Sequence, residues 1–168
     1  RGRSADLASR ERAPDPSIMS TSGEEGSGSE DGELDAAELA ELLHTACIAG
    51  DAESVRELLP YMDASSAALA NRQGATPLHS AAFNGHLAVC KALIDGKCDI
   101  DAAEERGCTA LFLAAQSGHE SVVARLMVAG GNAMRTCALG STPQMAAIQN
   151  GWPGVVRVLA RSTELGSE

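Results

Sequence analysis

Aromatic side chains are scarce in this sequence of 168 residues and make up only 2% of it. They are Tyr61, Phe83, Phe112 and Trp152. A core with so few large rings must be built from Ala, Leu and Val. These residues suit closely packed helices better than a β-sandwich, whose strands favour aromatic and β-branched residues. The scarcity of aromatics therefore argues against an all-β fold.

Long apolar runs are also missing. The best candidate, residues 154–160, is short and is interrupted by Arg157, whereas a membrane-spanning helix needs about eighteen or more apolar residues. The charged opening of the chain has no apolar run behind it, so no secretory signal is recognised in the sequence as given. We expect no membrane insertion.

Basic residues are outnumbered, with 13 Lys and Arg against 23 Asp and Glu, which gives a formal net charge of −10. A chain of that sign repels phosphate backbones instead of releasing their counterions. We therefore expect no nucleic acid among its partners.

The five cysteines form neither a C-x-x-C pair nor an even set. This pattern fits neither a disulfide framework nor a common zinc module, so we expect a reducing compartment, the cytoplasm, with the nucleus as the alternative. Cys47 and Cys90 fall on apolar helix faces, where a free thiol acts as a small hydrophobe. Cys98 and Cys108 flank a predicted hairpin, and the expected compartment argues against a disulfide between them.

Composition changes sharply near residue 35. Residues 1–34 are rich in Ser, Gly and acidic groups and hold few large aliphatics, which predicts a disordered acidic tail. The first methionine is Met19, so the preceding residues are upstream sequence or the chain is a fragment; the sequence leaves both open. Residues 162–168 are predicted to be a short C-terminal tail.

Internal repeats of 33 residues dominate the rest of the chain. Five columns share this period. They are Gly74, Gly107 and Gly140; Thr76, Thr109 and Thr142; Gly85, Gly118 and Gly151; Val89, Val122 and Val155; and Leu93, Leu126 and Leu159. Helix periodicity does not generate a period of 33, so each unit must be one recurring supersecondary element.

Each unit is predicted to contain two short helices and an extended excursion. Thr76 can cap a helix that begins at Pro77, and Gly85 can end it in a left-handed conformation. A second, amphipathic helix is predicted over residues 87–94. Residues 97–106 then form a hairpin-like connection to the next unit.

These residues resemble the ankyrin repeat. The stretch T-P-L-H-S-A-A-F-N-G-H at 76–86 matches that family's pattern at every specified position, and the copies at 109–119 and 142–152 keep the frame with more departures. A degenerate earlier copy lies at 42–50. The resemblance implies an all-α fold, an ankyrin-type α-solenoid of helix-turn-helix repeats joined by β-hairpin-like loops, over residues 35–161.

We expect four units, at about 35–70, 71–103, 104–136 and 137–161. The first has lost Thr-Pro, and Asp35 with Glu38 can supply a capping box instead. Glu38 and Glu41 would give this terminal unit a polar outer side. The last unit ends in an apolar helix, so we expect the chain either to self-associate through this end or to fray there.

No constellation of catalytic residues is recognised, so we expect no enzyme activity, cofactor or metal. The sequence has no G-x-S-x-G and no P-loop, and His86 and Cys90 lack a third metal ligand nearby. The resemblance gives the histidines a structural role, which is to bond backbone groups at turns. They are His44, His79, His86 and His119.

The resemblance implies a non-enzymatic protein-interaction module, a scaffold or adaptor. Its partner would lie on the concave side, against the hairpin tips and the exposed side of each first helix. The alternative is a substrate-recognition or regulatory segment of a larger enzyme, ubiquitin ligase or channel. The candidate residues are Arg72, Gln73, Phe83, Asn84, Glu105, Arg106, Gln116, Ser117, Leu139 and Gln149, and the tips also include Asn71, Ala75, Glu104, Cys108, Cys137, Ala138 and Ser141.

Overall fold

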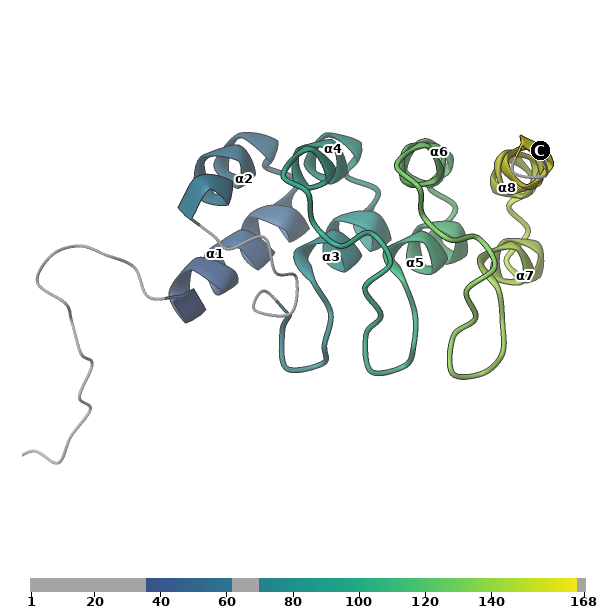
Figure 1. Cartoon of the computed structure of the whole chain (residues 1–168), viewed down its shortest axis with the longest axis horizontal. Coiled ribbons are helices and arrows are strands. Elements are labelled where there is room, and N and C mark those ends of the chain that lie inside the picture. Colours follow the sequence, from purple (N-terminus) through teal and green to yellow (C-terminus); the bar gives the residue numbers. More distant parts are fainter. Residues whose placement is uncertain (1–35, 62–69, 166–168) are drawn as a thin grey trace, which may run out of the picture. The chain divides into compact units, whose positions relative to one another are not determined.

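The structure is a computed structural model that describes residues 36–61 and 70–165 (Figure 1), with side chains as far as Arg161. Within these ranges it is helical, which confirms the predicted all-α fold. The helices are α1 (Ala36–Ala49), α2 (Ala52–Leu58), the 3-10 turn η2 (Leu59–Tyr61), α3 (Pro77–Asn84), α4 (Leu87–Asp95), α5 (Ala110–Ser117), α6 (Glu120–Val128), α7 (Pro143–Gln149) and α8 (Pro153–Leu165). The predicted tails and the Asp35 cap lie outside the described residues, apart from residues 162–165, which belong to α8.

The helices are arranged in two rows. Figure 1 shows α1, α3, α5 and α7 in one row and α2, α4, α6 and α8 in the other, with the inter-unit loops projecting beside the first row. Each helix packs on its partner within the pair and on its counterpart in the next pair; for example, α3 packs on α4 and α5. The four helix pairs therefore stack as the α-solenoid that the repeats predict.

The helix ends lie where the sequence places them. Thr109 caps α5, and its hydroxyl accepts the Phe112 N–H at 3.3 Å. Gly85 and Gly118 follow α3 and α5 with φ of 78° and 84°, a region that favours glycine. Because the threonine and glycine recur every 33 residues, the second, third and fourth units begin and end their first helices with the same residue types.

The core is aliphatic, as the low aromatic content predicts. Phe112 is the one aromatic side chain among the buried residues that the structure describes. The other large side chains come from both rows, and each contributes about 1.5–3 kcal/mol through its burial. They include Leu43, Val55, Leu78, Val89, Leu93, Leu111, Val122, Leu126, Val155 and Leu159. The repeating Val and Leu columns therefore form one continuous core.

The inter-unit loops form a second set of contacts between units. The Glu105 N–H donates to the Gln73 carbonyl at 3.2 Å, and the Ala138 N–H donates to the Arg106 carbonyl at 2.8 Å. A Cβ on Gly107 would stand 3.1 Å from the Ala138 nitrogen, so a glycine here allows this close approach. The three loop tips thus form a hydrogen-bonded row beside α3, α5 and α7.

Candidate functional site

His79 links two units through its buried ring, which is 2% exposed. Its Nδ1 accepts the Thr76 N–H at 3.1 Å, so Nε2 carries the proton and donates to the Cys108 carbonyl at 3.0 Å. Burial lowers the pKa of His79, and the bond to Cys108 opposes this effect. The ring is therefore neutral near pH 7 and holds the second unit against the third.

The histidines after the turn glycines have the same kind of role. The Nε2 of His86 bonds to the Ile48 carbonyl at 2.9 Å, and the Nε2 of His119 bonds to the Phe83 carbonyl at 2.9 Å. Trp152 takes this position in the last unit, where its Nε1 donates to the Gln116 carbonyl at 3.0 Å. These bonds confirm the structural role for His79, His86 and His119. Over residues 36–61 and 70–165, no group of three or more His, Cys, Asp or Glu could hold a metal ion.

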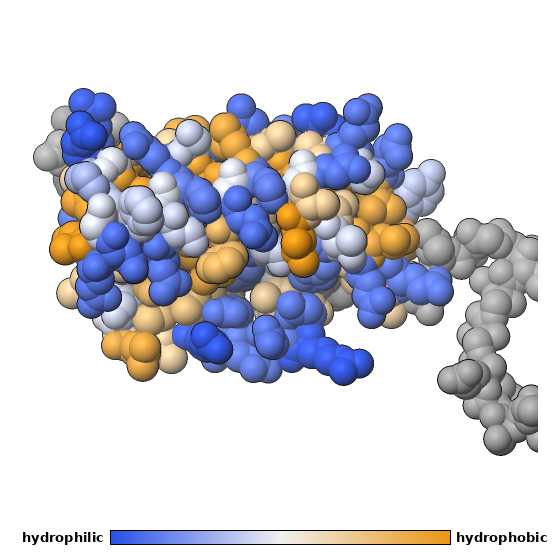
Figure 2. Space-filling model, turned by 180° about the vertical axis from the view of Figure 1, so that it is seen from behind, coloured by the Kyte–Doolittle hydropathy of each residue, from blue (hydrophilic) through white to orange (hydrophobic). Residues whose placement is uncertain are grey.

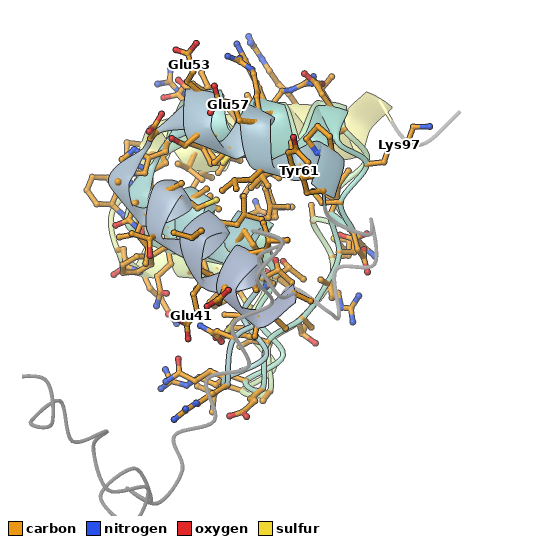
Figure 3. All side chains as sticks on the ribbon, turned by 90° about the vertical axis from the view of Figure 1, so that its left-hand side faces the viewer. Glu41, Glu53, Glu57, Tyr61 and Lys97 are labelled. Atoms are coloured by element: carbon orange, nitrogen blue, oxygen red, sulfur yellow. The ribbon has the colours of Figure 1, made fainter. Side chains whose placement is uncertain are left out.

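A hollow lies between α1 and the first loop tip. Its lining includes Glu41, His44 and Ile48 from α1, Arg72 from the tip and Ser80 from α3. Figure 3 shows Glu41 projecting from α1 on the side where the loops lie. The same view shows the labelled glutamates of α2, Glu53 and Glu57, on the opposite side of the stack. The hollow therefore opens between the first-row helices and the tips.

The partner-binding residues predicted from the sequence lie on the same side of the stack as the hollow, because they hold equivalent positions in the repeat. Ile48, which lines the hollow, stands two residues before its turn glycine, as three predicted residues do in later units. We call the exposed residues at the tips and at these helix ends the tip face. It comprises Glu41, Ile48, Arg72, Gln73, Phe83, Asn84, Glu105, Arg106, Gln116, Leu139 and Gln149. Ser117, which was also predicted, is half-buried.

Three tip positions that the sequence assigned to the surface are buried, so that part of the prediction is wrong. Ala75 is 9% exposed, Cys108 8% and Cys137 7%. Cys108 and Cys137 pack beside Phe112 under the tips. Asn71 is exposed, but its Oδ1 accepts two backbone N–H groups of its own tip, at 2.9 and 3.0 Å. The three buried positions shape the tips from beneath, and Asn71 fixes the backbone of its own tip.

Sequence reasoning missed the part of the tip face that comes from α1. It treated the first unit as a cap and placed Glu41 on the outer side, whereas the structure places Glu41 in the hollow with Arg72. The signal available in the sequence was Gly50, which stands two residues after Ile48 just as Gly85 stands two residues after Phe83. In the structure Gly50 has a φ of 82°, as the later turn glycines do.

The tip face changes character along the stack. In Figure 2 the lower edge is hydrophilic over the first two tips and hydrophobic toward the C-terminal tip. The residues follow this trend, with Arg72, Glu105 and Arg106 on the first two tips and Leu139, which is 91% exposed, on the third. The face thus offers charged contacts at one end and an apolar contact at the other.

The C-terminal end of the stack exposes apolar side chains, as the sequence predicts. Met145 and Ile148 are 52% and 60% exposed. Two repeat periods earlier their positions hold His79 and Ala82, which lie in the interior of the stack and are 2% and 0% exposed. The last unit therefore presents the surface that inner units use for stacking.

Comparisons with known proteins agree with this fold. The family described as ankyrin repeats (3 copies) matches residues 29–104 and 96–167. The chain therefore belongs to the ankyrin-repeat family, and this membership indicates a protein-interaction module. Within the described ranges, no helix is long and apolar enough to cross a bilayer.

Two curated relatives contain similar stretches. The probable E3 ubiquitin-protein ligase XBOS32 of Oryza sativa subsp. japonica is 37% identical over 112 residues, which is 64% of this chain and 22% of that protein. The ankyrin repeat-containing protein ITN1 of Arabidopsis thaliana is 45% identical over 53 residues, 32% of this chain and 9% of that protein. The chain thus spans less than a quarter of either relative.

Proposed function

We propose that this chain is a non-enzymatic scaffold or adaptor that binds a protein partner through its tip face, the concave side of the stack, in the cytoplasm. The exposure of large apolar and Arg side chains on that one face carries the proposal. Ile48 is 57% exposed, Phe83 53% and Leu139 91%, and Arg72 and Arg106 are exposed on the tips beside them. Aromatic and Arg side chains dominate interface energies, so these residues are suitable anchors.

The backbone beneath the tip face is already ordered, which favours binding. Asn71 holds the first tip, and the backbone bonds from Glu105 to Gln73 and from Ala138 to Arg106 fix the tips to each other. A preorganised surface loses less conformational entropy on binding than a flexible loop does. The partner gains most if it presents acidic groups to the two Arg tips and an apolar group to Phe83.

A triple variant tests the proposal. Replacing Arg72, Phe83 and Arg106 by Ala should lower affinity for the partner, captured by pull-down and identified by mass spectrometry, at least about a hundredfold. Each side chain contributes about 1–3 kcal/mol if it is central to the interface. Circular dichroism should remain unchanged, since all three residues are exposed.

A second triple variant controls for changes in surface charge and hydropathy. Arg56, Lys91 and Val128 lie exposed on the second-row helices and match the first set as two cations and one apolar side chain. Their replacement by Ala should leave binding within about twofold of the parent chain, as expected of residues outside an interface. Equal loss in both variants, or retained binding by the well-folded first variant, would refute the tip face as the site.

A second candidate function is substrate recognition within a larger ubiquitin ligase. The specific observation is the similarity to a probable E3 ubiquitin-protein ligase, which spans 64% of this chain. Under this alternative the same tip face holds a protein that becomes ubiquitylated. Incubating the longer protein and the captured partner with ubiquitin and its activating and conjugating enzymes separates the two functions, because a scaffold alone leaves the partner unmodified.

Self-association through the C-terminal unit stays a prediction. Its basis is the exposure of Met145 and Ile148 at the end of the stack. Light scattering over a concentration series tests it: the apparent mass should rise with concentration, and an Ile148→Gln variant should remain monomeric.

A further inference from the structure

Two cysteine side chains lie together where the third and fourth units meet. Cys108 follows the turn glycine of one tip and Cys137 opens the next. Both belong to a small buried cluster with Phe112, apart from the main core, and the Cys108 thiol donates to the Arg106 carbonyl at 3.9 Å. The Cα of Cys137 lies only 3.6 Å from where a Cβ on Gly107 would stand. The backbone next to Cys108 therefore approaches that of Cys137 closely, and a disulfide needs neighbouring backbones of this kind.

Cys137 occupies the place that Asn71 holds in the first tip, two repeat periods earlier. The Asn71 Oδ1 accepts the N–H groups of the residues two and four positions later, at 2.9 and 3.0 Å. Leu139 and Ser141 stand in the same relation to Cys137, and their backbone N–H groups lower the pKa of its thiol. The turn that holds the Asn71 oxygen in the first tip therefore places backbone N–H donors near the Cys137 sulfur in the third. Such donors favour the thiolate form of a cysteine.

The two thiols of the pair differ in acidity. Burial raises the pKa of Cys137, but its hydrogen bonds from Leu139, Ser141 and Cys108 outweigh this effect and lower the pKa overall. The pKa of Cys108 is raised to about 11 by burial and by its hydrogen bond to the Glu104 carboxylate. Cys137 is therefore the nucleophile, and Cys108 holds its proton beside an acceptor.

The remaining cysteines differ from this pair and lie away from it. Cys47 and Cys90 are 0% exposed, and burial raises the pKa of each to about 12. Cys98 packs against the main core, and burial raises its pKa to about 11. Cys98 and Cys108 thus belong to different clusters and both are free thiols, which agrees with the argument from the sequence against a disulfide between them.

We propose that Cys108 and Cys137 are a peroxide-responsive thiol pair that forms a reversible disulfide between the third and fourth units. The Cys137 thiolate attacks hydrogen peroxide, breaks its O–O bond and becomes a sulfenic acid, and hydroxide leaves. The Cys108 sulfur then attacks the Cys137 sulfur, and the sulfenic hydroxyl leaves with the Cys108 proton as water. Glu104, which lies beside the Cys108 thiol, can relay this proton from Cys108 to the leaving hydroxyl and ends the step unchanged. This site is independent of the proposed partner.

Peptide mapping of the full chain tests the pair. After treatment with hydrogen peroxide and blocking of free thiols with N-ethylmaleimide, trypsin releases residues 107–125 and 136–157, each with a single cysteine. We expect these two peptides to be linked, with the mass of their sum less two hydrogen atoms, and dithiothreitol to separate them. A disulfide that uses Cys98, or a Cys137 that is oxidised without any link to Cys108, would overturn the proposal.

Single variants test the assigned roles. Cys108→Ser should lose the link and instead accumulate a Cys137 sulfenic acid that dimedone traps, whereas Cys137→Ser should lose both products. Cys90→Ser is the matched control, and its yield of linked peptide should equal that of the parent chain. In the untreated parent chain, iodoacetamide should label Cys137 at least about tenfold faster than Cys90, because the thiolate is the reactive form. Equal labelling rates, or Cys108 oxidation that persists in Cys137→Ser, would contradict the assignment.

Discussion

Replacing His79 by Leu should lower the free energy of unfolding by about 2 kcal/mol, because it leaves the buried Thr76 N–H without a partner and removes one of the two bonds that the Cys108 carbonyl accepts. The imidazole bonds these groups at 3.1 and 3.0 Å, and the Cys108 carbonyl keeps its bond from the Glu104 N–H. Urea unfolding followed by circular dichroism measures the change. Because the Cys108 carbonyl belongs to the next unit, the loss should weaken stacking as well as the local cap.

The matched control is Phe112→Leu, since Phe112 stands at the same position one unit later. That change exchanges one apolar side chain for another and should cost less than about 1.5 kcal/mol. If Phe112→Leu were as damaging as His79→Leu, the effect would come from packing at this position and not from the hydrogen bonds.

The pH dependence of the free energy of unfolding provides a second test of His79. Burial lowers the pKa of His79 below its ordinary value of 6.5, so the unfolded chain takes up the proton first as the pH falls. The stability that the neutral ring contributes is therefore complete above pH 6.5 and is lost as the pH falls toward the folded-state pKa. The difference between the parent chain and His79→Leu should shrink from pH 7 to pH 5.

Replacing Gly118 by Ala should cost about 2–4 kcal/mol, whereas Gly151→Ala should cost only about 1 kcal/mol. Both glycines end a first-row helix with positive φ, 84° and 75°, so both substitutions strain the backbone alike. A Cβ on Gly118 would stand 2.5 Å from the Trp152 ring, whereas a Cβ on Gly151 would meet nothing within 4 Å. The difference in unfolding free energy between the two variants therefore measures how closely the Trp152 ring packs on the turn at Gly118.

Urea unfolding of the two variants measures that excess directly. A second readout is the fluorescence of Trp152, the single tryptophan of the chain. It should shift in Gly118→Ala, which must displace the ring, and stay unchanged in Gly151→Ala. Equal costs for the two variants would mean that Trp152 does not pack on the preceding turn.

Features set by local chemistry could be predicted from the sequence. A threonine cap, a proline at the first helical position and a turn glycine act within a few residues, so the limits of α3 follow from Thr76, Pro77 and Gly85. The structural role of His79, His86 and His119 also followed, from the resemblance to the ankyrin repeat. The row of Val and Leu columns gave the core, because these columns recur with the repeat.

Features that depend on neighbouring units could not be predicted in this way. Glu41 joins the hollow because the first tip lies opposite α1, and no local pattern in the degenerate first unit shows this. Cys108 and Cys137 are close only because adjacent tips bond to each other. Ser117, predicted as a surface residue from its place in the repeat, is half-buried in the stack.

Amide hydrogen exchange of the chain, free and bound to its captured partner, tests the tip face most directly. Binding through this face should slow exchange in the tips around residues 71–75, 104–108 and 137–141 and at the ends of α1, α3 and α5. The second-row helices α2, α4 and α6 should remain unchanged. Slowed exchange confined to α2, α4 and α6, with the tips unaffected, would contradict the account.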